Sequence, residues 1–417
     1  MAHGGLTDLI GAGGGRAPAR ATPKTWVLVR YRLTDWWARV LVVFVVSRIV
    51  TTAILLSFAA RQDANAWTGA HPGYLDFAKL WDGHWYYIIA LAGYPTELPM
   101  TDDGHVGESA WAFMPAYPFL LRVLMFVTGL DFRVLAVFVS LAFALGTALM
   151  FYKLMNLVLP SGTALFAVVL YCFAPLSPIL QVAYAESMQA FFLTLALYLL
   201  VKRDYWRLVP VVIVMSLTRP SGLAFALAMG LHVVYRWVQR ERDPFGRREV
   251  VASVTVGLVS VASGFAWLFI AGAVTGSLTA YTDTELAWRS PYIGYQALVP
   301  LTPWIFGAGF WAPGPLGIVL LVAAVLAFAA FMFSRPVRRL GPDIRLWVAS
   351  YVLYLLAVFF PQSSTFRLLL PIFPLWGALA QPRSWIYRVA LVGLCIAGQV
   401  GWIYIAWWVD GYDWTPP

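Results

Sequence analysis

The feature that most constrains this chain is a close succession of apolar runs from Trp37 almost to its end. A helix needs roughly 20 mostly apolar residues to cross the hydrocarbon core of a bilayer. Hydrophobic residues make up 61% of the 417 residues, and charged residues make up only 12%. The short alternating segments that are typical of a β-barrel are absent from the sequence. We therefore predict an all-α polytopic membrane protein with about ten to eleven transmembrane helices.

The basic residues behind the net charge of +9 gather in short loops between the apolar runs. Orientation by the positive-inside rule requires such a pattern, so the charge does not indicate nucleic-acid binding. Residues 1–35 are rich in Gly, Ala and Arg and lack the apolar core of a signal peptide. We predict a cytoplasmic basic tail there. Cys172 and Cys395 lie inside apolar runs, where they are expected to be small buried hydrophobes.

Loop charges also predict the orientation of the chain. The basic flank of the first span, which begins near Trp37, keeps the N-terminus inside, so the polar segment 61–111 is expected outside as a first outer loop. Basic residues on either side of the aromatic segment 275–315 place that segment outside as well. Residues 36–410 would then form a single transmembrane domain, followed by an outer tail at 411–417. The active face is expected to be extracytoplasmic.

The middle of the chain allows two topologies. If every apolar run between 113 and 235 is one full crossing, Lys153 and Lys202 lie outside, against the positive-inside rule. Placing them inside requires one fewer crossing before Lys153 and a helix break at 218–222. We favour the second topology, since prolines in these runs make short or broken helices plausible. It brings the segments 174–187 and 218–222 toward the outer face.

An acidic residue at the start of an amphipathic helix is the first candidate for chemistry. Trp81, Trp85 and Ile89 recur at helical spacing in the first outer loop, as in a helix that lies on a membrane surface. Asp82 stands at the start of this helix. It is expected either to cap the helix or to act as a general base at the membrane boundary, and the residues alone favour neither reading.

Four short elements in this part of the chain resemble the GPI mannosyltransferase II (PIG-V) family. In chain order they are Trp81-Asp82-Gly83 with the residues up to Tyr94, Phe113-Met114-Pro115-Ala116-Tyr117-Pro118, Pro175-Leu176-Ser177 with Ala183-Tyr184-Ala185-Glu186-Ser187, and Thr218-Arg219-Pro220-Ser221-Gly222. Two positions depart from the family pattern. Ala185 stands where Ser is usual, and Pro-Ser precedes Gly222 instead of Ser-Asn. These departures concern the acceptor more than the reaction.

The resemblance implies a GT-C fold and transfer of mannose from polyprenyl-phosphate-mannose to a glycolipid or lipoglycan acceptor. It implies an acidic residue in the first outer loop as the catalytic base, which maps to Asp82, and inversion at the sugar. No nucleotide sugar is used, no phosphate-binding glycine loop is found, and no cofactor or metal is expected. The abundance of Arg over Lys is typical of a GC-rich bacterial genome, so the cell membrane of a bacterium is the expected location.

The phosphate of such a donor needs cationic partners near the bilayer surface. Arg219 lies between apolar runs, where an Arg is costly and usually functional. It is expected either to bind the phosphate or to pair with a carboxylate such as Glu186. Arg367 precedes a Pro-containing apolar run, and it is expected either to bind the phosphate or to extend to the membrane interface. We favour Arg367 slightly for the phosphate.

Further residues are candidates for contact with the sugar or the acceptor, although each has a plain structural alternative. Glu186 could merely cap a helix, His84 could be an exposed interfacial histidine, and most outer aromatics could belong to an interfacial belt. The candidates are Trp81, His84, Tyr184, Glu186, Gln362, Glu285 and Trp288. The alternative function is a membrane transporter or flippase of a lipid-linked saccharide, which predicts internal repeats and mid-membrane charges that the sequence does not display.

Overall fold

The computed structural model describes residues 34–296, 299–361 and 364–409, and the candidate residue Gln362 lies outside them. The chain divides into two compact units, 1–39 and 40–417, and the second contains nearly all of the helices. Every regular element among the described residues is helical, apart from one isolated bridge between Met100 and Val106. The predicted all-α class is confirmed.

Five helices are long and apolar enough to cross a membrane. They are α2 (Trp36–Ala59), α6 (Phe132–Asn156), α11 (Arg247–Thr275), α14 (Pro315–Met332) and α19 (Trp385–Trp402), the last extended by a final turn η4 (Ile403–Trp407). These lengths and compositions make the chain a multi-pass membrane protein by the usual span requirement. The predicted ten to eleven crossings require several shorter helices to cross too.

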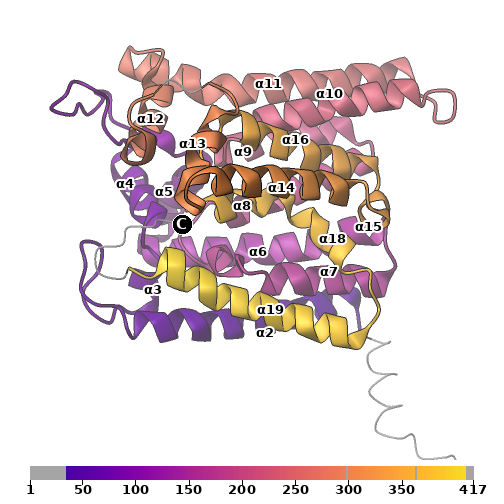
Figure 1. Ribbon diagram of the computed structural model, residues 1–417, viewed down its shortest axis with the longest axis horizontal. Helices are drawn as coiled ribbons and strands as arrows, with labels where there is room; N and C mark the ends of the chain where they lie inside the picture. The colour runs from indigo at the N-terminus through magenta and orange to yellow at the C-terminus, as the bar shows by residue number, and fades with distance from the viewer. Residues whose placement is uncertain (1–33, 297–298, 362–363, 410–417) are drawn as a thin grey trace, which may run out of the picture. The chain divides into compact units, whose positions relative to one another are not determined.

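Shorter apolar helices pack beside the long ones or connect them along the chain (Figure 1). They are α5 (Ala116–Thr128), α7 (Ser161–Phe173), α8 (Glu186–Val201), α9 (Tyr205–Thr218), α10 (Gly222–Val238), α16 (Pro342–Val358), and the run of η3 (Leu370–Leu375) and α18 (Trp376–Leu379). The remaining pieces are α3 (Tyr74–Phe77), α4 (Asp82–Ala92), η1 (Ala110–Ala112), η2 (Ser177–Gln181), α12 (Ala280–Ile293), α13 (Thr302–Trp311), α15 (Arg335–Arg338) and α17 (Thr365–Leu368).

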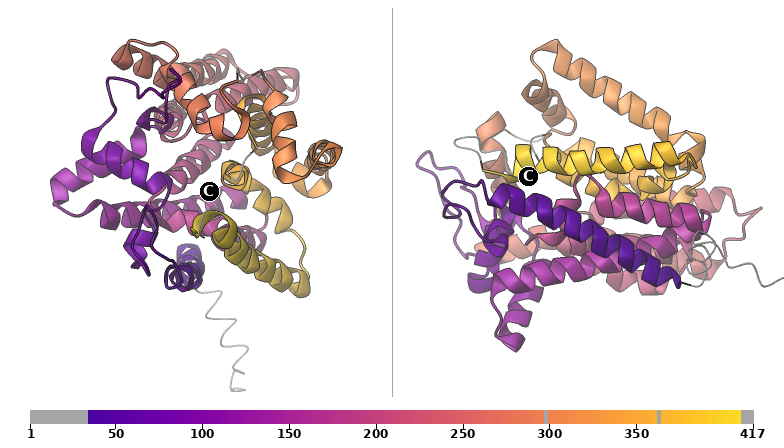
Figure 2. Two further views of the ribbon diagram at one scale, coloured as in Figure 1. Left: turned by 60° about the vertical axis from the view of Figure 1, so that its left-hand side comes forward. Right: turned by 90° about the horizontal axis from the view of Figure 1, so that it is seen from below.

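The helices of the second unit run between two ends of a bundle (Figures 1 and 2). One end, here called the loop end, holds α3, α4, α5, α12 and α13. A buried cluster ties α4 there to the starts of α6 and α8, through Tyr86, Ala136 and Met188. Because α6 and α8 both start at the loop end, their last turns, which contain or adjoin Lys153 and Lys202, lie toward the other end.

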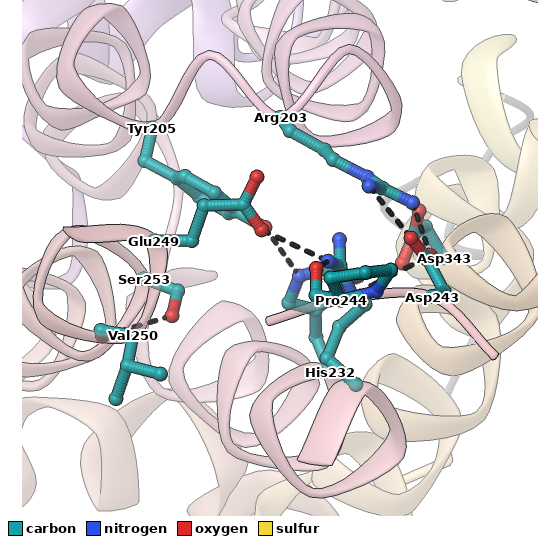
Figure 3. Close-up of polar contacts among 10 residues, drawn as sticks. Arg203, Tyr205, His232, Asp243, Pro244, Glu249, Val250, Ser253 and Asp343 are labelled. Atoms are coloured by element: carbon teal, nitrogen blue, oxygen red, sulfur yellow. Dashed lines mark hydrogen bonds and ion pairs between the residues drawn. The ribbon is translucent and has the colours of Figure 1, made fainter. Parts of the chain in front are cut away.

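The other end, here called the basic end, is held together by a partly buried polar network (Figure 3). His232 Nδ1 lies 2.7 Å from Asp343 Oδ1, and His232 Nε2 lies 2.9 Å from the Tyr205 hydroxyl. Arg203 Nη1 donates to Asp243 Oδ1 at 3.0 Å. Next to this pair, Arg236, which is buried, donates to Glu249 Oε2 at 2.8 Å, so the ends of α9, α10, α11 and α16 are joined.

The predicted helix break at 218–222 is present. α9 ends at Thr218, Arg219 has an extended backbone (φ −149°, ψ 151°), and α10 begins at Gly222. Pro220 explains the break, because proline disfavours a helical conformation in the residue before it. A Cβ on Gly222 would come within 2.8 Å of the Gly264 backbone, so α10 and α11 approach each other closely at this point.

The segment 174–187 is also a break, between α7 and α8, and it lies against the first outer loop. Ala183 N donates to Ala78 O at 2.9 Å. Arg48 of α2, only 8% exposed, fixes the same segment by donating to the carbonyls of Cys172 at 2.7 Å and Ser177 at 3.1 Å. The segments 174–187 and 218–222 therefore both reach the loop end, as the favoured topology requires.

This topology predicts which positions an impermeant reagent can reach from outside intact cells. Lys153→Cys is expected to resist labelling by a membrane-impermeant maleimide, because the favoured topology places its end of α6 at the cytoplasm. Asp102→Cys, in the exposed first outer loop, is expected to react. The native Cys172 and Cys395 are buried and should give little background.

Labelling of both introduced cysteines from outside would overturn the topology. Permeabilised cells supply the control, since Lys153→Cys should then react as well.

Candidate functional site

A four-charge cluster lies at the loop end where α4, α8, the α9–α10 break and α17 meet. It consists of Asp82, Glu186, Arg219 and Arg367. The four side chains are only 14%, 6%, 17% and 10% exposed, respectively. Two carboxylates thus face two guanidiniums in a largely dry site, where charges are tolerated only when they are paired.

The ion pairs of the four-charge cluster centre on one oxygen of each carboxylate. Asp82 Oδ2 accepts from Arg367 Nη1 and lies 3.4 Å from Arg219 Nη2. Glu186 Oε1 accepts from the same Arg219 nitrogen and lies 3.7 Å from Arg367 Nε. Both arginines therefore bridge both carboxylates, and each guanidinium, with five N–H donors, keeps donors that a further anion can use.

Local backbone chemistry sets the position of Asp82. Trp81, the residue before α4, has a positive φ of 59°, which turns the chain sharply into the helix. Gly83 then allows a close approach, since a Cβ there would meet the Ala183 side chain at 3.2 Å. The backbone N–H of Asp82 donates to the Tyr184 hydroxyl at 3.0 Å. Trp81, not Asp82, occupies the N-cap position of α4, and the Asp82 carboxylate accepts from Arg367 and Arg219.

The other three members of the cluster are likewise held by ion pairs. Glu186 is the first residue of α8, after the N-cap residue Ala185, and its carboxylate accepts from Arg219. Arg219 pairs with Glu186, as its structural alternative predicted, and with Asp82 in addition. Arg367 does not extend to an interface. Its guanidinium carbon lies 5.5 Å from the centre of the buried Tyr184 ring, and it pairs with Asp82.

The four-charge cluster forms part of the wall of a cavity of about 450 Å³. Beyond the four charged residues, the lining includes side chains from α8, the helix break, α12 and α16. Those that bear polar groups are Gln189, Ser221, Tyr281, Thr282, Glu285, Trp288, Arg289, Tyr351, Tyr354 and Ser364. The cavity therefore has one strongly charged region and a larger wall of aromatic and hydroxyl-bearing side chains.

The structure brings five of the predicted site residues besides Asp82 onto this lining: Arg219, Arg367, Glu186, Glu285 and Trp288. Glu285 pairs with Arg289 at 3.4 Å. Trp288 packs edge-on against Trp85, with ring centres 5.4 Å apart. The predictions for Glu285 and Trp288 as substrate contacts fit this placement, although no ligand contact tests them.

Three other predicted residues lie outside that lining. Trp81 is buried and donates through Nε1 to the Trp407 carbonyl at 3.0 Å. Tyr184 is buried beneath Asp82 and holds its backbone. His84 packs edge-on against Trp67, with ring centres 5.1 Å apart. Burial and the nearby Lys79 ammonium lower the pKa of His84, which favours a neutral ring poorly suited to binding phosphate.

Sequence reasoning missed several lining residues, among them Gln189, Tyr351 and Tyr354. Gln189 follows Glu186 by three residues in α8, which places it on the same helix face. That spacing was a usable signal once Glu186 had been singled out. No local pattern indicated that Tyr351 and Tyr354, both on α16, would line the same cavity as Asp82.

Comparisons with known proteins add a distant likeness. No family model and no curated protein matches the sequence. The chain is similar to the archaeal oligosaccharyltransferase AglB from Archaeoglobus fulgidus, solved in complex with an inhibitory peptide and a dolichol-phosphate. The identity is 14% and the TM-score 0.42, over 88% of this chain and 55% of that one. The apo form gives 14% identity, a TM-score of 0.43 and the same coverage.

This chain thus spans about half the length of the structures it resembles. The resemblance to the GPI mannosyltransferase II family stays a prediction.

Removal of one carboxylate from the four-charge cluster should destabilise the protein. In Glu186→Ala, Arg219 and Arg367 would share a single carboxylate, and breaking a buried ion pair typically costs about 3–5 kcal/mol of unfolding free energy. Thermal unfolding in detergent is expected to show a clear fall in melting temperature. Asp76→Ala removes the exposed pair with Arg133, worth up to about 1 kcal/mol, and serves as the control. Equal melting temperatures for the two variants would contradict this account.

Proposed function

We propose that this protein is an inverting GT-C-type glycosyltransferase of the cell membrane. It would transfer a mannosyl residue from polyprenyl-phosphate-mannose to a glycolipid or lipoglycan acceptor on the extracytoplasmic face. The observation that carries the proposal is the contact of Asp82 with two buried arginines on the wall of one cavity. A carboxylate beside two guanidiniums supplies both a base and a binding site for a leaving phosphate.

The reaction needs few protein groups. The acceptor hydroxyl oxygen attacks the anomeric carbon, the bond from that carbon to the phosphate oxygen breaks, and the electron pair of that bond stays on the phosphate. Asp82 takes the proton of the acceptor hydroxyl. Arg219 and Arg367 stabilise the negative charge that grows on the leaving phosphate, which is the group whose charge changes most.

The resting ion pairs suggest how a donor would prepare the site. Without a ligand, Asp82 Oδ2 is in contact with both guanidiniums. A phosphate that binds Arg219 and Arg367 competes for those donors and frees the carboxylate to accept a proton. Glu186 would keep Arg219 in place through this exchange, since the pair is the more buried of the two that Arg219 makes.

A second, apolar cavity supports a lipid-linked donor. It measures about 540 Å³ and is bounded by apolar side chains from α14, η3, α18 and α19. Leu370 lines both cavities, and Phe366 and Leu369, which flank Arg367 on either side, line the apolar one. Because these three residues adjoin Arg367 in the sequence, an isoprenoid chain in this apolar cavity would have its phosphate close to that arginine.

The transporter alternative fits the charges less well. Coupling and substrate sites of such transporters lie near the bilayer midplane. Here Asp82 is the first residue of α4, which lies at the loop end of the bundle and not midway along the long helices (Figure 1).

The base role of Asp82 predicts a large, selective loss of transfer. In membranes that contain Asp82→Asn at a normal protein level, transfer of radiolabelled mannose from polyprenyl-phosphate-mannose should fall by at least about 10²-fold, the lower range for loss of a general base. Asp76→Asn is the matched control. Asp76 lies in the same loop but pairs with Arg133 and does not line the cavity, so transfer should stay near the wild-type rate.

Undiminished transfer by Asp82→Asn would remove this residue from the base role. A wild-type protein that transfers no lipid-linked sugar would remove the whole proposal.

A further inference from the structure

Four buried polar atoms of cavity-lining residues have no hydrogen-bond partner among the described residues. They are Glu186 Oε2, Gln189 Oε1, Trp288 Nε1 and Arg367 Nε. Buried polar groups in folded proteins are nearly always bonded, and leaving one unbonded costs about 1–3 kcal/mol. Several unbonded polar groups around one cavity therefore indicate a ligand that forms hydrogen bonds with them.

The orientation of the Gln189 amide follows from its neighbours. Gln189 Nε2 donates to Ser221 Oγ at 2.8 Å, and Ser221 Oγ in turn donates to the Arg219 carbonyl at 3.2 Å. With its one hydroxyl hydrogen on that carbonyl, Ser221 accepts from the Gln189 amide nitrogen. The amide oxygen is then left as an acceptor without a donor, on a residue that is only 2% exposed.

Glu186 and Gln189 carry their unbonded acceptor oxygens on one face of α8. The two residues are three positions apart, so they are neighbours on the helix surface, and both line the cavity. Glu186 uses Oε1 for the arginines, which leaves Oε2 open. The same face therefore offers two adjacent hydrogen-bond acceptors directly beside the phosphate-binding arginines.

The chemistry of these acceptors restricts the ligand to a donor of hydrogen bonds. An anion would be repelled by two acceptor oxygens. A metal ion is disfavoured because the Glu186 charge is already met by guanidiniums, and no group of three His, Cys, Asp or Glu side chains gathers anywhere in the described part of the chain. Neutral hydroxyl groups fit, and the unbonded indole N–H of Trp288 can donate to a further hydroxyl oxygen.

We propose that Glu186 and Gln189 form a subsite for the hydroxyl groups of the hexose being transferred, and that Gln189 is a specificity-determining residue. This inference rests on the proposed function. It places the donor sugar rather than the acceptor against α8, since the sugar is bonded to the phosphate and the phosphate ligands Arg219 and Arg367 are the ones that contact Glu186.

The test compares polyprenyl-phosphate-mannose with analogues that each lack one sugar hydroxyl. For the wild type, kcat/KM should fall about 10-fold for at least one monodeoxy donor, the effect of one lost hydrogen bond. In Gln189→Met, which keeps the side-chain length but removes the acceptor, kcat/KM for the parent donor should fall about 10-fold, with no further loss for that analogue. Melting temperature in detergent checks that the variant is folded.

A variant that loses the same factor with the parent and with every analogue would overturn the subsite, as would a variant that behaves like the wild type. If Gln189→Met does not fold, the analogue series on the wild type decides, and equal rates for all monodeoxy donors overturn the inference. Failure of the proposed function gives a different result: the wild type makes no product from any donor, and both proposals fall.

Discussion

The mutual neutralisation of two carboxylates and two guanidiniums at the loop end is the interaction on which the rest of the structure depends. Each charge alone would cost several kcal/mol to bury, and only close pairing with good hydrogen bonds offsets that cost. The four-charge cluster draws its members from four separate segments. Those segments must therefore come together at the loop end. The helix breaks at 174–187 and 218–222 allow this.

The irregular segments are where backbone chemistry departs from the simple spanning helix. Pro220 breaks a long apolar run so that Arg219 sits between two helices, and the segment 174–187 breaks another so that Glu186 begins α8. Arg48 and the Ala183–Ala78 bond hold the second break against the first outer loop. Backbone that is not helical is tolerated at this depth because it is buried in protein or lines a cavity. The polar network of the basic end joins the same helices at their far ends (Figure 3).

Much of this could be predicted from the sequence because it depends on local chemistry. Apolar runs predicted the helices and Pro220 predicted the break. Four charged candidates, Asp82, Glu186, Arg219 and Arg367, proved to be in contact. Other parts depend on packing between distant segments. No local pattern indicated that Trp81 would donate a hydrogen bond to the Trp407 carbonyl or that Gln189 would be left with an unbonded oxygen. Length and composition supported only five long spans, because the shorter helices are broken where they serve the site.

The central claim is that Arg219 and Arg367 together hold the phosphate of a lipid-linked sugar beside Asp82. The most direct measurement is a cryo-EM structure of the protein in a nanodisc with polyprenyl phosphate bound. The account predicts the phosphate within hydrogen-bond distance of both guanidiniums, and the isoprenoid chain in the apolar cavity that Leu370 shares with the site. A phosphate bound at the basic end, or one that leaves both arginines on Asp82 and Glu186, would contradict it.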